Sequence, residues 1–116
     1  MRRLLAVLCA IAPAALAQPS GSPAARPFSV TLDAKAMHEE CVRLEAGENR
    51  RFYWKSDAPV DFNIHYHRER EVFYPVKRDA MRGDGGSFTA KTGEDYCWMW
   101  TARAKAARLE GKIEPK

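Results

Sequence analysis

Residues 60–67, Val-Asp-Phe-Asn-Ile-His-Tyr-His, alternate strictly between apolar and polar side chains. Side chains point to opposite faces along a β-strand with a period of two, so this stretch is predicted to be a half-buried strand. Its apolar half, which includes Phe62 and Tyr66, faces a core. Its polar half, which includes His65 and His67, is predicted to turn to solvent on the other face of the sheet.

Similar alternating runs recur along most of the chain. They lie at 28–32, 38–44, 50–56, 60–67, 68–77, 87–90, 95–101 and 108–114. The breaks between them carry turn-forming residues, as in the stretch MRGDGG at 81–86. About 7–8 short strands at this spacing predict an all-β fold, an antiparallel β-sandwich or a small barrel. Helix-forming composition at 33–40 and 102–110 leaves helices there as an alternative.

The first 17 residues have the features of a secretory signal peptide. Arg2 and Arg3 precede an apolar run, and Ala15-Leu16-Ala17 supplies small residues at the two positions that a signal peptidase requires. The run is shorter than the roughly 20 residues that span a bilayer, although a retained membrane anchor is the alternative. We expect cleavage after Ala17, a flexible lead-in over 18–27 and one domain over 28–116, in the periplasm or outside the cell.

Composition excludes several classes of function. Removal of the signal leaves about 100 residues, which is enough for one small domain. It also removes two basic residues, so the formal net charge of +4 falls further towards neutrality. Mixed charges of this kind do not indicate a nucleic-acid or acidic-membrane partner. A Gly-rich phosphate loop, a zinc quartet and a G-x-S-x-G elbow are all missing from the sequence.

Two cysteines remain after the signal is removed. Cys9 lies in the signal, which leaves Cys41 and Cys97 as an even pair in an oxidising compartment. A disulfide between them would close a loop of about 57 residues, worth roughly 4 kcal/mol in the chain-entropy model. Two free buried thiols are the alternative. A catalytic dithiol is not indicated, because the sequence has no C-x-x-C spacing.

Four motifs in order resemble the GOLD (Golgi dynamics) domain, an antiparallel sandwich of cargo-receptor-like secretory proteins. They are an early cysteine at Cys41, Val-Asp-Phe-Asn-Ile at 60–64, Gly-Ser-Phe at 86–88 and the pair Tyr96-Cys97. The resemblance covers residues 38–112. It implies that the late cysteine bonds to the early one and that the protein is a noncatalytic binding module. Membrane-bound members carry a coiled coil and a membrane helix after the domain, whereas this chain stops at Lys116, so cargo selection is not implied.

The two histidines raise a second hypothesis, which is metal binding. On one strand face, His65 and His67 would lie about 7 Å apart at Cα, near enough to share a cation. Glu71 completes H-x-H-x-x-x-E, which resembles the first metal motif of cupins, where a divalent metal is bound inside a barrel. Pro59 stands where that motif has glycine. Met99 is a candidate soft ligand, and soft ligands beside imidazole favour copper.

The late aromatic stretch has a structural explanation. Tyr96, Trp98 and Trp100 share one face of the predicted strand at 95–101, and large aromatics in a small sandwich usually form its core. Together with Phe62 and Tyr66, they are the predicted core aromatics. The sequence thus predicts a noncatalytic module for a ligand or protein partner. A periplasmic copper-binding protein and a cupin-like metalloenzyme are the alternatives.

Overall fold

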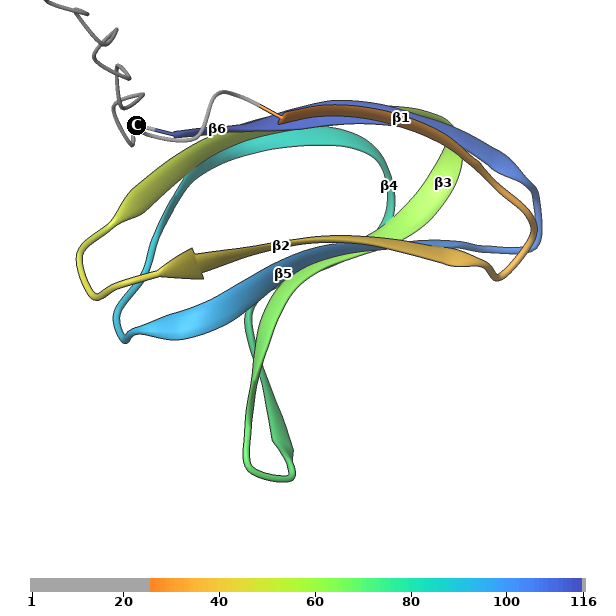
Figure 1. Cartoon of the computed structure of the whole chain (residues 1–116). Helices are drawn as coiled ribbons and strands as arrows, with labels where there is room; N and C mark the ends of the chain where they lie inside the picture. Colours follow the sequence, from red (N-terminus) through yellow and green to blue (C-terminus); the bar gives the residue numbers. More distant parts are fainter. Residues whose placement is uncertain (1–25, 116) are drawn as a thin grey trace, which may run out of the picture.

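The computed structural model describes residues 26–115, which contain six β-strands and no helix (Figure 1). The strands are β1 (Arg26–Leu32), β2 (Met37–Leu44), β3 (Asn49–Arg68), β4 (Glu71–Thr89), β5 (Glu94–Ala102) and β6 (Ala107–Pro115). The all-β prediction is confirmed, and the alternative helices are not formed. The predicted signal peptide and residues 18–25 of the lead-in lie outside the described residues. Within residues 26–115, no helix has the length and apolarity to cross a membrane.

The strands are fewer than the seven or eight expected, because two of them are long. β3 has 20 residues and joins the predicted runs at 50–56 and 60–67 across Pro59. β4 has 19 residues, and the predicted loop at 81–86 is extended within it. The β3–β4 pairing shifts register between Lys55 and Val60 and again further along. Irregular pairing of this kind tolerates a proline and bends a strand without ending it.

All six strands form one antiparallel sheet. Its order is β1-β6-β3-β5-β2, and β4 pairs with β3. β3 changes partner along its length, since residues 50–56 pair with β6 and residues 60–65 pair with β5. The sheet consequently curls into a half-barrel in which the β1–β6 part faces the β2–β5 part (Figure 1). The β3–β4 hairpin projects away from this curled body (Figure 1).

The inside of the curl is filled by aromatic rings. Of the predicted core aromatics, Phe62, Tyr96, Trp98 and Trp100 are buried, and Tyr66 is half-buried against them. The other buried apolar residues are Leu32, Leu44, Phe52, Trp54, Ala58, Val60, Ile64, Phe88, Ala90, Ala102, Ala107 and Leu109. Trp100 stacks on Phe62 with ring centroids 5.6 Å apart. The period-two alternation of residues 60–67 therefore does separate the inner from the outer face, as predicted.

The predicted disulfide is present. Cys41 on β2 and Cys97 on β5 are direct cross-strand partners, and their sulfur atoms are bonded at 2.06 Å. β2 pairs with β5 alone in the described sheet. The bridge therefore fastens an edge strand to the body of the half-barrel.

Candidate functional site

The two histidines of β3 lie on the outer face of the curled sheet but differ in burial. His65 is only 3% exposed, whereas His67 is exposed. The rings are neighbours, with centroids 5.2 Å apart, and the Tyr74 ring lies 5.8 Å from that of His65. The expectation that both imidazoles turn to solvent is therefore wrong for His65. Alternation predicts only the face of the sheet on which His65 lies. Side chains of neighbouring strands, including the Tyr74 ring, bury it on that face.

Both ring nitrogens of His65 have a polar neighbour, and one of them makes a hydrogen bond. Its Nδ1 lies 2.7 Å from Oδ1 of Asn63, and because that amide oxygen only accepts, the ring donates from Nδ1. Its Nε2 lies 3.5 Å from Oε1 of Glu39. Burial lowers the pKa of His65; the Glu39 carboxylate opposes this shift and His67 adds to it. In the neutral ring, the lone pair is then on Nε2, beside Glu39.

Glu39 was not found from the sequence. It lies on β2, and the register places it opposite Met99 of β5, which is in turn opposite Asn63 of β3. Met99 is thus on the outer face, as predicted, and a cross-strand row connects Glu39 to the His65 environment. Local periodicity carries no information about which strands pair, so no signal in the sequence could identify this carboxylate.

Of the other two predicted metal ligands, Met99 lies in this cross-strand row. Glu71 begins β4 at the hairpin turn, where it pairs with Arg68. Within residues 26–115, the recorded group of three potential ligands is instead Glu39, Cys41 and Cys97, whose ligand atoms all lie within 4.8 Å of one another. The histidines also lie outside the curl, whereas a cupin metal is held inside a barrel.

A second candidate surface lies where the projecting hairpin meets the turn between β4 and β5. A groove of about 550 Å³ is lined there by Tyr66, Phe73, Tyr74, Pro75, Val76, Phe88, Thr89, Lys91, Thr92 and Tyr96. Tyr66 stacks on Phe73 with centroids 5.1 Å apart and meets Tyr96 edge-on at 5.3 Å. The Arg68 guanidinium lies 5.6 Å and 5.8 Å from the Tyr66 and Phe73 centroids and pairs with Glu94. These contacts fix the rings before any ligand arrives.

The side of the hairpin that carries His65 and His67 is also apolar, and Tyr74 borders both this side and the groove. Val72 and Tyr74 are 39% and 48% exposed, and they are two of the four exposed large hydrophobic residues recorded in the described chain. Val72 pairs with His67 across the hairpin, and Tyr74 contacts His65 and Lys77. Both sides of the projecting element therefore present aromatic or aliphatic surface.

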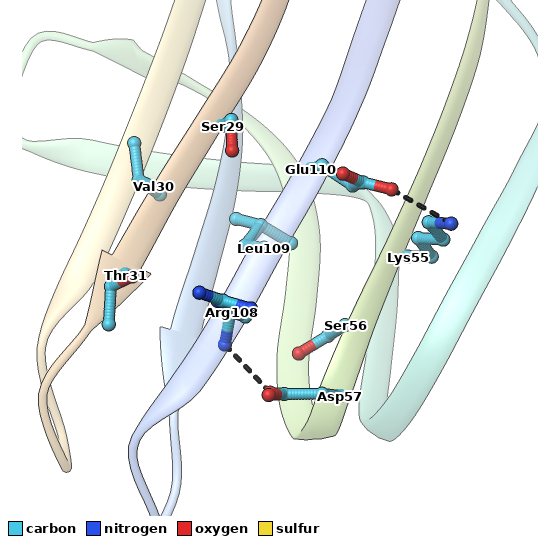
Figure 2. A pocket seen from close by; sticks show the side chains of 9 residues that line it. All are labelled: Ser29, Val30, Thr31, Lys55, Ser56, Asp57, Arg108, Leu109 and Glu110. Carbon is cyan, nitrogen blue, oxygen red and sulfur yellow. Dashed lines mark hydrogen bonds and ion pairs between the residues drawn. The ribbon is translucent and has the colours of Figure 1, made fainter.

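A third hollow, of about 610 Å³, lies over β1, β6 and β3 (Figure 2). Its charged lining is balanced, with Lys55 and Arg108 against Asp57 and Glu110. Lys55 and Glu110 pair at 2.8 Å, and Asp57 accepts a hydrogen bond from the backbone N–H of Arg108 at 2.7 Å (Figure 2). Because two cationic side chains are balanced by two anionic ones, the hollow offers a ligand little net charge.

No family model matches the chain, and no curated protein matches it. Solved structures do show similarity. A mitogen derived from Yersinia pseudotuberculosis aligns at 10% identity and a TM-score of 0.56, over 82% of this chain and 88% of that one. The pre-peptidase C-terminal domain of a collagenase from Bacillus anthracis aligns at 10% identity and 0.59, over 78% and 90%.

A third similarity is weaker. A periplasmic inhibitor of g-type lysozyme from Aeromonas hydrophila aligns at 10% identity and a TM-score of 0.49, over 84% of this chain and 93% of that one. At this level of identity, the two stronger similarities show a shared β fold alone. None of the three is described as a GOLD domain, so membership of that family stays a prediction.

Proposed function

We propose that this protein is an exported, noncatalytic binding module whose contact surface is the β3–β4 hairpin together with the aromatic groove at its base. The observation that supports this most directly is the hairpin itself. It projects from the half-barrel (Figure 1) and carries apolar surface on both sides. Exposed apolar surface costs solubility, so a concentrated patch on a projecting element is typical of an interaction site.

The rings are suited to recognition because they are already ordered. Tyr and Phe side chains supply large contact areas with few rotatable bonds, and such anchors dominate many binding interfaces. The Tyr66–Phe73 stack and the Arg68–Glu94 pair hold the groove side of the hairpin in place. A groove of about 550 Å³ also falls within the usual range of small-ligand sites. Either a small ligand or a segment of a protein partner fits this description.

Two further observations support export and a noncatalytic role. The Cys41–Cys97 disulfide is typical of proteins that fold in an oxidising compartment. The ring nitrogens of His65 face an amide oxygen and a carboxylate rather than the hydroxyl of a nucleophile. A general base for nucleophilic catalysis needs that hydroxyl within hydrogen-bond reach.

Site-specific photo-crosslinking in the producing cells tests the proposal. A photoreactive phenylalanine analogue placed at Tyr74 should give a discrete crosslinked adduct. The same analogue at Tyr53 is the matched control, since Tyr53 is similarly exposed at 52% but lies in the part of β3 that pairs with β6. Adducts that form equally from both positions, or from neither, would contradict the hairpin as the contact surface.

A further inference from the structure

We propose that the outer face of β2, β5 and β3 holds a zinc site that is closed while Cys41 and Cys97 are bonded and opens when they are reduced. The ligands are the two cysteine sulfurs, a carboxylate oxygen of Glu39 and Nε2 of His65. This inference does not depend on the binding role of the hairpin. It also differs from the His-x-His hypothesis, because it leaves out His67.

The register places the four ligands on adjacent strands of one face, with Glu39 next to both the sulfurs and the imidazole. Cys41, Cys97 and His65 lie in one cross-strand row on three adjacent strands. Glu39 lies two residues before Cys41, on the same face of β2, and its carboxylate belongs to the group of ligand atoms within 4.8 Å that includes both sulfurs. That carboxylate is also 3.5 Å from Nε2 of His65. Glu39 therefore connects the sulfurs to the imidazole.

One of these separations is already that of a pair of ligands on a bound metal. Zinc bonds of about 2.0–2.3 Å in a tetrahedral site place neighbouring ligand atoms about 3.3–3.8 Å apart. The distance of 3.5 Å between Glu39 and His65 is already of this size. His65 lies outside the 4.8 Å group, so the sulfurs must rotate towards it, which becomes possible once the bond between them is broken.

His65 is prepared as a ligand by Asn63. Histidines that bind metals usually donate their other ring N–H to a polar oxygen, which fixes the tautomer and the ring orientation. Here Nδ1 of His65 donates to Oδ1 of Asn63 at 2.7 Å, so the lone pair is on the nitrogen that faces Glu39. Asn63 is itself buried, which limits alternative rotamers.

The chemistry of opening is a thiol–disulfide exchange. A dithiol reductant attacks the Cys41–Cys97 bond, two protein thiols form, and the dithiol is oxidised to its own disulfide. Cys41 is exposed, so a small dithiol can reach the bond. Binding of Zn²⁺ then releases the two thiol protons and leaves two thiolates as ligands. Two thiolates with an imidazole favour zinc over the hard cations magnesium and calcium.

Metal titration of the full chain tests the site. The protein is reduced with a dithiol, the reductant is removed without oxygen, and Zn²⁺ is added in competition with a chromophoric chelator. We expect one equivalent to bind to the reduced protein and at least roughly tenfold weaker binding to the oxidised protein, which lacks the thiolates. Co²⁺ in place of Zn²⁺ should give the thiolate charge-transfer and tetrahedral absorption bands.

Two pairs of variants locate the ligands. Glu39→Gln and His65→Ala should each weaken Zn²⁺ binding by roughly tenfold or more. Glu40→Gln is the control for the first, because Glu40 bonds to His38 instead. His67→Ala is the control for the second. Both controls should bind as the parent does. His65 is buried, so its variant can fail to fold. In that event the Glu39→Gln result alone tests the site, because Glu39 is exposed and its substitution leaves the core untouched.

Three results would overturn the site. The first is reduced parent protein that binds no Zn²⁺. The second is oxidised protein that binds it as tightly as reduced protein. The third is Glu39→Gln protein that binds it unchanged, since the thiols would then act without the proposed partners. A loss of binding in His67→Ala together with unchanged binding in Glu39→Gln would favour the His-x-His pair instead.

Discussion

Gly111 of β6 occupies a point where three strands leave no room for a side chain. A Cβ atom there would lie 2.5 Å from the carbonyl oxygen of Tyr53, 2.7 Å from Cβ of Trp54 and 2.8 Å from Cζ of Phe28. Since the nearest of these atoms is backbone, Gly111→Ala can be accommodated only by moving strands apart. We expect it to lower the free energy of unfolding by about 1–3 kcal/mol, as overpacking of a core does.

Urea unfolding of Gly111→Ala beside Gly86→Ala measures this effect. Nothing lies within 4 Å of a Cβ atom at Gly86. The control substitution should therefore change the free energy of unfolding by no more than about 0.5 kcal/mol. Equal stabilities for the two variants would show that β6 is not packed as tightly as this geometry requires.

Asp61 of β3 joins three segments through its carboxylate. Its Oδ1 accepts the backbone N–H of Ala80 at 2.9 Å and pairs with Arg103 at 2.6 Å. Partial burial acts to raise the pKa of Asp61. The Ala80 hydrogen bond and the charges of Arg103 and Lys77 outweigh this, so the pKa lies below its usual value of 3.8.

A lowered carboxyl pKa gives acid sensitivity of a definite sign. As the pH falls, Asp61 takes up its proton at a higher pH in the unfolded chain than in the folded protein. The ionised carboxylate therefore stabilises the fold above the unfolded-state pKa, and this stabilisation is lost as the pH falls through the folded-state pKa. Between about pH 5 and about pH 2, the free energy of unfolding of the parent should fall more steeply than that of Asp61→Asn. Matching slopes for Asp61→Asn and the parent would rule out this role.

The strands themselves show what local sequence can and cannot predict. Alternation over 60–67 correctly separated core from outer face, because side-chain direction in a strand depends only on the neighbouring backbone. The ends of strands were less predictable. Pro59 and the glycines at 81–86 usually break strands, yet β3 and β4 continue through them. The register shifts that tolerate these residues come from pairing with distant strands.

The same limit applies to the candidate sites. The disulfide was predictable because only two cysteines lie outside the predicted signal peptide. The pairing of His65 with Glu39 was not, since it depends on the order β3-β5-β2 across the sheet. The projection of the β3–β4 hairpin was not predictable either, because it depends on how far each neighbouring strand pairs along β3. The apolar character of the hairpin appears once Val72, Tyr74 and the Tyr66–Phe73 stack are placed in space.

The bend of β3 between its two partner strands is fixed by Asp57. Its carboxylate accepts the backbone N–H of Arg108 where β6 begins, while Ser56 donates to the carbonyl of Ala58 at 2.7 Å. Asp57→Ala leaves the exposed Arg108 N–H without this acceptor and should lower the free energy of unfolding by about 0.5–1.5 kcal/mol. Asp57→Asn retains the oxygen and should lose less. Thermal unfolding of both variants compares them, and equal losses would show that the charge matters rather than the hydrogen bond.

At the scale of the whole molecule, the half-barrel is one curled sheet whose two end strands do not pair with each other. β1 and β2 are the two ends of the strand order, and β2 is joined to the rest by β5 alone. β2, like β1 at the other end, is therefore hydrogen-bonded to the sheet along one side only. The Cys41–Cys97 bond lies in the middle of this β2–β5 pairing and connects residues 56 positions apart.

Loss of that bond should have the largest effect on stability of any change considered. For a closed loop of about 57 residues, the chain-entropy model gives about 4 kcal/mol, against a typical total of 5–15 kcal/mol for a domain. We expect Cys41→Ser/Cys97→Ser to lower the free energy of unfolding by this amount in urea titrations. Dithiol reductant should lower that of the parent equally and leave the double variant unchanged. If Zn²⁺ binds the reduced parent, it should restore part of the loss in the parent but not in the double variant, because a ligand that binds only the folded state stabilises it. A double variant as stable as the oxidised parent would show that strand pairing alone holds β2, and that the bond is dispensable for the fold.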